Sequence, residues 1–223
     1  MPLLLSRHLS PTATLGIWQI AEDEAFFRTD LPLTPGEEED LTRYKDLRRM
    51  EWLASRWLLH KLTGALERLP LAKNVFAKPF FLDAPDLHCS LSHSQGIVGA
   101  LFDTHPCGCD IQVLVEKMAR LAHKFIGPDE KPFLENHGMD DQFDLMHVFW
   151  TAKESLYKVY GLKELDFRQH LRLEPFDWFA GRGQTRGWVE KGEHRECYKV
   201  ITEKMSLPEG EREMVWTVAL SSL

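Results

Sequence analysis

Twice along the chain, a stretch in which apolar residues recur at helical spacing is followed by short strand-like runs. Across Leu41–Leu62 apolar residues recur every three or four positions, which is the period of a helix. Shorter, strand-like runs follow at 87–92 and 97–102, with Ser94-Gln95-Gly96 as the turn between them, and they predict a β-hairpin. A second helical stretch, roughly Asp141–Tyr160, again precedes strand-like runs. Two such rounds predict an α+β fold made of two lobes.

Local signals refine this outline. Thr34 before Pro35 is typical of a helix start, and Gly64 and Gly161 are typical of helix ends. The stretch Leu41–Leu62 is expected to form two helices. A lobe boundary near residue 105 gives lobes of residues 1–105 and 106–223. Further helices are expected at 117–125 and after the Gly-Pro-Asp-Glu segment 127–130, and further strands at 15–20, 107–115, 188–189, 196–202 and 214–220.

Charge and composition exclude several classes of protein. The 223 residues include 27 Lys and Arg against 34 Asp and Glu, a net charge of −7, which disfavours a nucleic-acid binder. The apolar run Leu3–Leu5 is too short for a signal peptide or a membrane span. Four cysteines are too few for a disulfide scaffold. We therefore expect a cytoplasmic protein with reduced thiols, monomeric by default.

Polar residues in the predicted strand 107–115 require an explanation. Period two places Asp110 and Gln112 on one face of this strand. Apolar residues on both faces predict that the strand is covered, and a covered carboxylate needs a cation or a metal as partner. The alternative is that Asp110 lies at an exposed sheet edge, and the two readings have equal weight for this residue alone.

Two other polar segments have simple structural explanations when each is taken alone. Glu154 and Lys158 are four residues apart on the predicted helix, on the face opposite its apolar stripe, as an ordinary surface ion pair would be. Lys153 flanks the stripe. His93 lies between two serines and could be an exposed residue of the hairpin turn.

Taken together, the order and spacing of these segments resemble the 4′-phosphopantetheinyl transferase superfamily, specifically its stand-alone two-lobed members related to the surfactin- and enterobactin-synthetase activating enzymes. The family signatures match Ser92-His93, Gly108-Cys109-Asp110 and the segment Trp150–Lys158. Two weaker matches are the Arg-rich segment Arg48–Arg56 and Lys78-Pro79. The resemblance spans about residues 43–160. It implies a pseudo-two-fold arrangement of two α+β lobes, each a small antiparallel sheet packed with helices.

The resemblance also implies an activity: Mg²⁺-dependent transfer of the 4′-phosphopantetheine arm of coenzyme A to a serine of an acyl, peptidyl or aryl carrier protein, with release of 3′,5′-ADP. By this analogy the metal is held by Asp110, Glu154 and Gln112. Catalytic roles fall to Glu154, Lys158 and Asp110. Contacts to coenzyme A fall to Arg48, Arg56, Lys78, Ser92, His93, Lys153 and Lys158, with Arg49 as an alternative to Arg48.

One position departs from the family pattern. Many members have a second acid where this chain has Gln112, so we expect two carboxylates, an additional water and weaker Mg²⁺ binding. Glu154 is the best-placed candidate for the general base, directly or through a metal-bound water. Glu130 resembles an acidic position of the family, but a surface location is the stronger interpretation, and no catalytic role is assigned to it.

There are two alternatives to a magnesium-dependent enzyme, a zinc site and a non-catalytic binding protein. A zinc site among the His and Cys residues of 88–109 is disfavoured, because Cys107 and Cys109 are too close for the usual ligand spacing. A non-catalytic protein that binds coenzyme A or a carrier remains the alternative to an enzyme. Basic residues concentrate at 41–61 and again at Lys117, Arg120, Lys124 and Lys131, which predicts local attraction of an acidic carrier protein.

Overall fold

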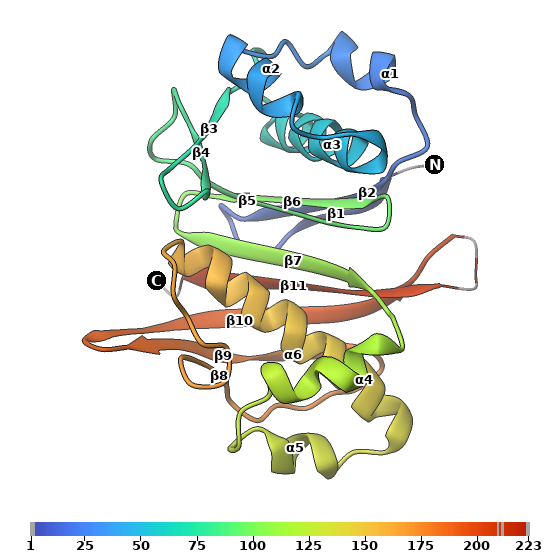
Figure 1. Cartoon of the computed structure of the whole chain (residues 1–223), viewed down its shortest axis with the longest axis vertical. Coiled ribbons are helices and arrows are strands. Elements are labelled where there is room, and N and C mark those ends of the chain that lie inside the picture. Colours follow the sequence, from blue (N-terminus) through green and yellow to red (C-terminus); the bar gives the residue numbers. More distant parts are fainter. Residues whose placement is uncertain (1–2, 209, 211, 222–223) are drawn as a thin grey trace. The chain divides into compact units, whose positions relative to one another are not determined.

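The computed structural model describes residues 3–208, 210 and 212–221, and the chain divides into two compact units, Met1–Cys107 and Gly108–Leu223. Each unit combines helices with an antiparallel sheet (Figure 1), so the predicted α+β class is confirmed. Among the described residues, no helix is both long enough and apolar enough to cross a bilayer.

The first unit places one long helix against a four-stranded sheet. The sheet order is β1-β2-β6-β5, and α3 packs on it, as Figure 1 shows. A short hairpin, β3 with β4, lies beside β5. The elements are β1 (Leu3–His8), β2 (Thr14–Gln19), α1 (Glu24–Thr29), α2 (Pro35–Leu41), α3 (Asp46–Thr63), β3 (Leu71–Lys73), β4 (Pro79–Phe81), β5 (His88–Ser94) and β6 (Ile97–Asp103).

The local signals of this unit act as expected. Thr34 caps α2 in a reciprocal arrangement with Glu37, and Pro35 occupies the first turn. The division expected within Leu41–Leu62 falls at the very start of that stretch, since α2 ends at Leu41 and α3 is one continuous helix from Asp46 to Thr63. α3 ends at Gly64, whose φ of 64° is left-handed. The predicted hairpin is β5 and β6, joined at Gln95 and Gly96, both with positive φ.

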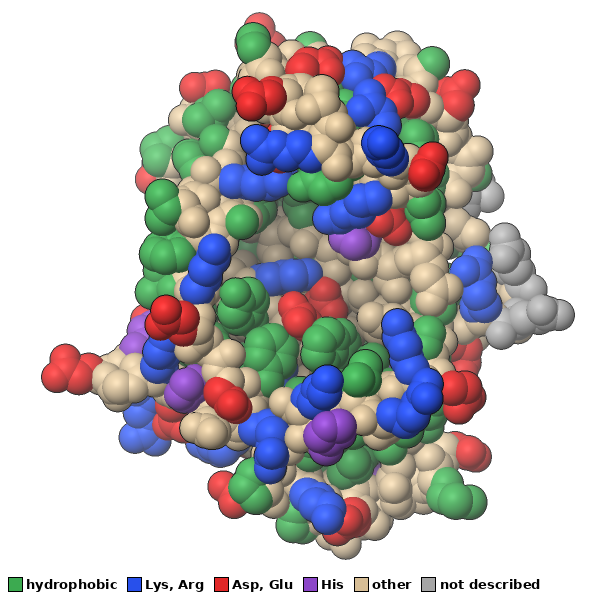
Figure 2. Space-filling model, viewed as in Figure 1, with side chains coloured by type: hydrophobic (Ala, Val, Ile, Leu, Met, Phe, Trp, Pro, Cys, Tyr) green, Lys and Arg blue, Asp and Glu red, His purple; other side chains and the backbone are tan. Residues whose placement is uncertain are grey.

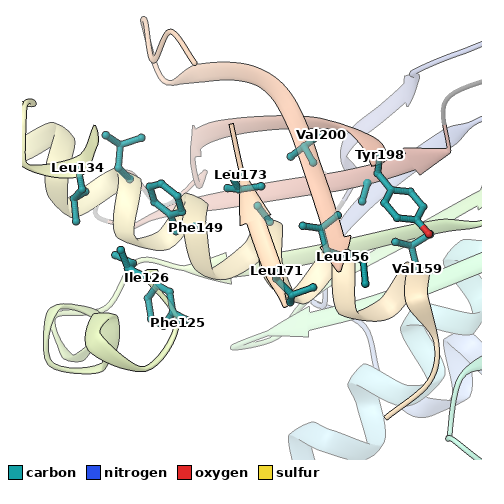
Figure 3. Packing of buried hydrophobic residues seen from close by; sticks show 14 of the residues in the cluster. Phe125, Ile126, Leu134, Phe149, Leu156, Val159, Leu171, Leu173, Tyr198 and Val200 are labelled. Atoms are coloured by element: carbon teal, nitrogen blue, oxygen red, sulfur yellow. The ribbon is translucent and has the colours of Figure 1, made fainter. Parts of the chain in front are cut away.

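The second unit packs a 22-residue helix across a five-stranded sheet of order β7-β11-β10-β9-β8. Leu156, Val159 and Phe149 of this helix form a core with strand residues such as Val200 (Figure 3). The elements are β7 (Cys107–Val113), α4 (Lys117–Leu121), a 3-10 turn η1 (Ala122–Lys124), α5 (Lys131–Glu135), α6 (Met139–Tyr160), β8 (Leu171–Leu173), β9 (Arg182–Lys191), β10 (His194–Ser206) and β11 (Glu213–Ser221).

Several elements were not predicted. β3, β4 and β8 have three residues each, which is too short to display a period, and α1 has only six. β1 was not predicted, and β9 is much longer than the expected 188–189 because its first half is polar and partly exposed. β7 ends at Val113 rather than at residue 115.

Candidate active site

Gly108 allows strand β7 to lie directly against helix α6. A Cβ built at this position would be 2.0 Å from the carbonyl oxygen of Ser155 and 2.8 Å from the amide nitrogen of Val159. Only a residue without a side chain permits this approach. Asp110, two residues further along β7, is consequently carried close to the same helix and is only 7 % exposed. β7 is the edge strand of its sheet, but Asp110 is buried there, so the alternative of an exposed position for Asp110 is wrong.

Lys158 of α6 is the ionic partner of Asp110. Its ammonium nitrogen is 2.7 Å from Oδ1 of Asp110 and donates a second hydrogen bond to the carbonyl oxygen of Cys109 at 2.9 Å. Burial opposes the charge of Lys158, but the nearby carboxylate outweighs it and raises the pKa of Lys158. The Lys158 side chain as a whole keeps 26 % of its surface exposed.

Glu154 lies one helical turn before Lys158 and belongs to the same cluster. Burial raises the pKa of Glu154 to about 7, the negative charge of Asp110 adds to that effect, and Lys158 opposes it. Two carboxylates therefore sit close enough to repel each other, with one lysine to balance them. The interpretation of Glu154 and Lys158 as an ordinary surface pair does not fit this geometry, because Lys158 pairs with Asp110 of β7.

This donor set fits a Mg²⁺ ion. Mg²⁺ prefers oxygen ligands, commonly one or two carboxylates, and keeps several waters. Within residues 3–208, 210 and 212–221, no three His, Cys, Asp or Glu side chains gather in the manner of a closed metal site. A partly hydrated cation bound here would offset the electrostatic repulsion between the two carboxylates.

Gln112 follows on the same strand. Its amide nitrogen donates a hydrogen bond to the carbonyl oxygen of Val113 at 2.8 Å, and the side chain is half-buried. Period two along β7 directs Gln112 and Asp110 to one face. The nitrogen end of the amide is thus held by the backbone.

Lys153 has a different environment from its neighbour Glu154. Its ammonium is completely buried and donates to Glu130 at 2.5 Å and to the carbonyl oxygens of Phe125 and Phe167 at 2.7 and 2.9 Å. Burial lowers the pKa of Lys153, and Glu130 opposes that shift. All three ammonium hydrogens have acceptors, so this lysine holds α6 to two loops and the expected phosphate contact does not fit.

Glu130 is the buried partner of Lys153. The surface location expected for this residue is wrong, because only 4 % of it is exposed. Besides Lys153 its carboxylate accepts the backbone N–H of Gly127 at 2.7 Å and of Leu173 at 2.9 Å. The pair is a fully hydrogen-bonded buried ion pair.

In the first unit, His93 and Arg48 converge on one carboxylate. Nδ1 of His93 is 3.0 Å from Oε2 of Glu51, and Nη1 of Arg48 is 3.6 Å from the same oxygen. Arg49 is bound instead to Glu24 at 2.8 Å, which leaves Arg48 as the arginine on the His93 side of α3. Glu51 was not recognised in the sequence, where it appears only as an acid within a basic helix. His93 is 38 % exposed.

Ser92 and Lys78 are less accessible than His93. Ser92 alternates with His93 along β5 and is only 5 % exposed. Lys78 directly precedes β4 and is half-buried, and burial lowers the pKa of Lys78.

Arg56 lies elsewhere on the same helix. Five residues separate it from Glu51, a rotation of about 140° around α3. Its guanidinium stacks on the ring of Trp52 at 3.6 Å and lines a cavity of about 290 Å³ beside Asp40 and Lys73. Burial lowers the pKa of Arg56 to about 10. The structure therefore does not bring Arg56 together with Arg48 and His93, contrary to the expected joint contact.

Fold and site together define an α+β protein that carries a carboxylate–lysine cluster between a buried strand and a helix. Residues 106–218, which include this cluster, match the sequence model of the 4′-phosphopantetheinyl transferase superfamily. The chain belongs to this superfamily.

Curated relatives agree with this assignment. The chain is 32 % identical over 111 residues to 4′-phosphopantetheinyl transferase gsp of Aneurinibacillus migulanus, covering 50 % of this chain and 46 % of the relative. It is 32 % identical over 126 residues to 4′-phosphopantetheinyl transferase Sfp of Bacillus subtilis strain 168, covering 55 % and 53 %. It is 28 % identical over 153 residues to a putative 4′-phosphopantetheinyl transferase of Synechocystis sp., covering 60 % and 62 %. The chain thus spans about half the length of the curated relatives it matches.

Proposed function

We propose that this protein transfers the 4′-phosphopantetheine arm of coenzyme A to a serine hydroxyl of an acyl, peptidyl or aryl carrier protein. The serine oxygen forms a bond to the phosphorus that bears the pantetheine, the bond from that phosphorus to the bridging oxygen breaks, and 3′,5′-ADP leaves. The observation that carries this proposal is the cluster of Asp110, Glu154 and Lys158 within the segment that matches the family.

The charged residues of the second unit suit this reaction. Phosphoryl transfer depends mainly on positioning and on charge stabilisation. Lys158 stays protonated because Asp110 holds it, so it can neutralise a phosphate oxygen or the leaving 3′,5′-ADP. Glu154, with a pKa of about 7, is suited to accept the serine proton near neutral pH.

Asp110 and Glu154 would also hold Mg²⁺, with Gln112 as a neutral oxygen donor or as a hydrogen-bond partner of a bound water. When bound, the ion would supply positive charge to the pyrophosphate. In the first unit we assign contacts with the nucleotide phosphates to Arg48 and His93, with Ser92 and Lys78 as further candidates.

The carrier partner is inferred from exposed positive charge. Lys117, Arg120 and Lys124 lie exposed on α4 and η1, and none of them has an ion-pair partner among the described residues. Figure 2 shows Lys and Arg side chains on the surface in the area of α4. We propose that these charges attract an acidic carrier protein, and that the enzyme acts as a cytoplasmic monomer. The presence of four free thiols supports the proposed location in a reducing compartment.

One assay tests the activity. Apo-carrier proteins are incubated with coenzyme A and Mg²⁺, and the carrier is examined by mass spectrometry for addition of phosphopantetheine to its serine. Asp110→Ala and Glu154→Ala are expected to abolish the addition, while Glu193→Ala, an exposed acid in the same unit, leaves it unchanged. Full activity in both site variants would contradict the assignment. Binding of coenzyme A without any addition across a panel of carriers would favour the non-catalytic alternative.

A further inference from the structure

A buried glutamate on α3 holds the exposed histidine of β5. Glu51 is only 5 % exposed, and both of its carboxylate oxygens are engaged. Oε1 accepts the backbone N–H of Gly96 at 3.1 Å, in the tight turn that follows β5. Oε2 faces Nδ1 of His93 at 3.0 Å and Arg48 at 3.6 Å. One carboxylate therefore ties helix α3 to both the turn and the histidine.

The chemistry of this contact determines which ring nitrogen carries the proton. Burial opposes ionisation of Glu51, but the bonds from His93 and Gly96 outweigh it, and the pKa of Glu51 is lowered. An ionised carboxylate can only accept hydrogen bonds, so Nδ1 of His93 must be the donor. Among the described residues, none forms a hydrogen bond or ion pair with Nε2 of His93. The His93 side chain is 38 % exposed. Nε2 is therefore the nitrogen presented to a ligand.

We propose that Glu51 is a positioning residue for coenzyme A: it fixes His93 with Nδ1 protonated and Nε2 directed outward, and it sets the spacing between His93 and Arg48 as two contacts for one phosphate group. This assignment rests on the proposed function, because coenzyme A is the phosphate ligand. Once a proton is added at Nε2, the ring donates to a phosphate oxygen while its Nδ1–H stays on Glu51. Residues that orient a histidine in this way typically contribute 10–100-fold in the metal sites where they have been measured.

A spectroscopic measurement on the unaltered protein tests the first half of the proposal. When the sample is titrated to a pH at which the His93 ring is neutral, the ¹⁵N shifts of the ring distinguish a protonated nitrogen from an unprotonated one. We expect Nδ1 to be protonated and Nε2 not. Glu51→Gln is expected to mix the two tautomers, because an amide can also donate to Nδ1. Protonation at Nε2 in the unaltered protein would overturn the proposal without any variant.

A double-mutant cycle on coenzyme A affinity tests the second half. Calorimetry is expected to show about tenfold weaker binding for Glu51→Gln when His93 is present, and less than twofold when Glu51→Gln is added to His93→Ala. Glu67→Gln, an exposed acid of the same unit, serves as the charge-matched control and leaves binding unchanged. Steady-state assays should show the change in KM for coenzyme A and not in kcat.

The outcomes separate this proposal from the proposed function. The positioning role would be overturned if Glu51→Gln weakened coenzyme A binding equally with His93 present and in the His93→Ala variant. It would also be overturned if Glu51→Gln weakened binding in neither. An unaltered protein that does not bind coenzyme A would overturn it as well. If the cycle holds but no carrier protein is modified, Glu51 positions His93 in a binding protein, and only the transfer activity fails.

Discussion

Replacing Lys153 with methionine should destabilise the second unit strongly. The substitution keeps the length and the apolar part of the side chain, but it removes the positive partner of Glu130, which is itself 4 % exposed. Breaking one side of a buried ion pair costs about 3–5 kcal/mol. The loss of hydrogen bonds to the carbonyl oxygens of Phe125 and Phe167, each worth about 1 kcal/mol, is consistent with the upper half of that range.

Urea unfolding followed by far-ultraviolet circular dichroism measures this loss. Lys153→Met and Glu130→Gln should each be costly alone, and the double variant should be less destabilised than their sum, with an interaction free energy of about 1–3 kcal/mol. A matched pair lies nearby: Lys131 and Glu135 are 3.4 Å apart but 68 % and 59 % exposed. Lys131→Met and Glu135→Gln should each change the free energy of unfolding by about 0.5 kcal/mol or less.

The result also separates two roles for Lys153. If it holds α6 to its neighbouring loops, Lys153→Met lowers the free energy of unfolding, and the protein that remains folded binds coenzyme A with nearly unchanged affinity. A variant of normal stability with greatly weakened coenzyme A binding would refute this reasoning. It would then restore Lys153 as a phosphate contact, the role implied by the family resemblance.

Three further predictions concern other residues of the second unit. Gly108→Ala places a Cβ 2.0 Å from a backbone oxygen of α6 and should lower the free energy of unfolding by about 3 kcal/mol or more in a urea titration. Gly138→Ala is the control, because its Cβ would meet nothing within 4 Å, and it should have little effect. Burial lowers the pKa of His147, whose Nε2 accepts a backbone N–H. Its contribution to stability is thus complete above the unfolded-state pKa of about 6.5 and decreases as pH falls below it. Unfolding of His147→Gln should lack that part of the pH dependence, and identical pH profiles would contradict this explanation. Gln112→Glu should lower the Mg²⁺ concentration for half-maximal activity by about tenfold, or ~1.4 kcal/mol, through added charge, and an unchanged value would exclude a role of Gln112 near the metal.

Local signals predicted the helices of this fold better than its short strands. The Thr34 cap and the left-handed Gly64 and Gly161 depend on neighbouring residues only, so they can be read directly from the sequence. The hairpin of β5 and β6 also has local pairing. By contrast β7 pairs with β11 from the far end of the chain, and pairing of this kind is decided by long-range packing that no local pattern encodes.

The burial of Asp110 was predicted from the sequence, whereas the hydrogen-bond partners of the candidate site residues were not. Asp110 is buried, as the apolar residues around it in the sequence indicate, but the pairing of its carboxylate with Lys158 depends on how closely β7 approaches α6. Glu130 and Glu51 were missed as partners because they meet Lys153 and His93 across 23 and 42 residues of chain, respectively. Glu130 had a signal in its resemblance to an acidic position of the family, and Glu51 had one as an acid three residues after Arg48 in a basic segment.

Helix α6 explains why adjacent residues of one motif have opposite roles. Consecutive residues point about 100° apart, so Lys153 faces the interior while Glu154 and Lys158 share another side. Thr151 and Ser155 face inward as well: they contact the hydroxyl of Thr217 on β11 at 2.7 Å and its carbonyl oxygen at 3.0 Å, and they hold the helix in place. A chain that kept this fold without any activity would still need these inward residues. We therefore expect substitution of Glu154, Lys158 or Asp110 to remove the proposed transfer activity and to spare the fold.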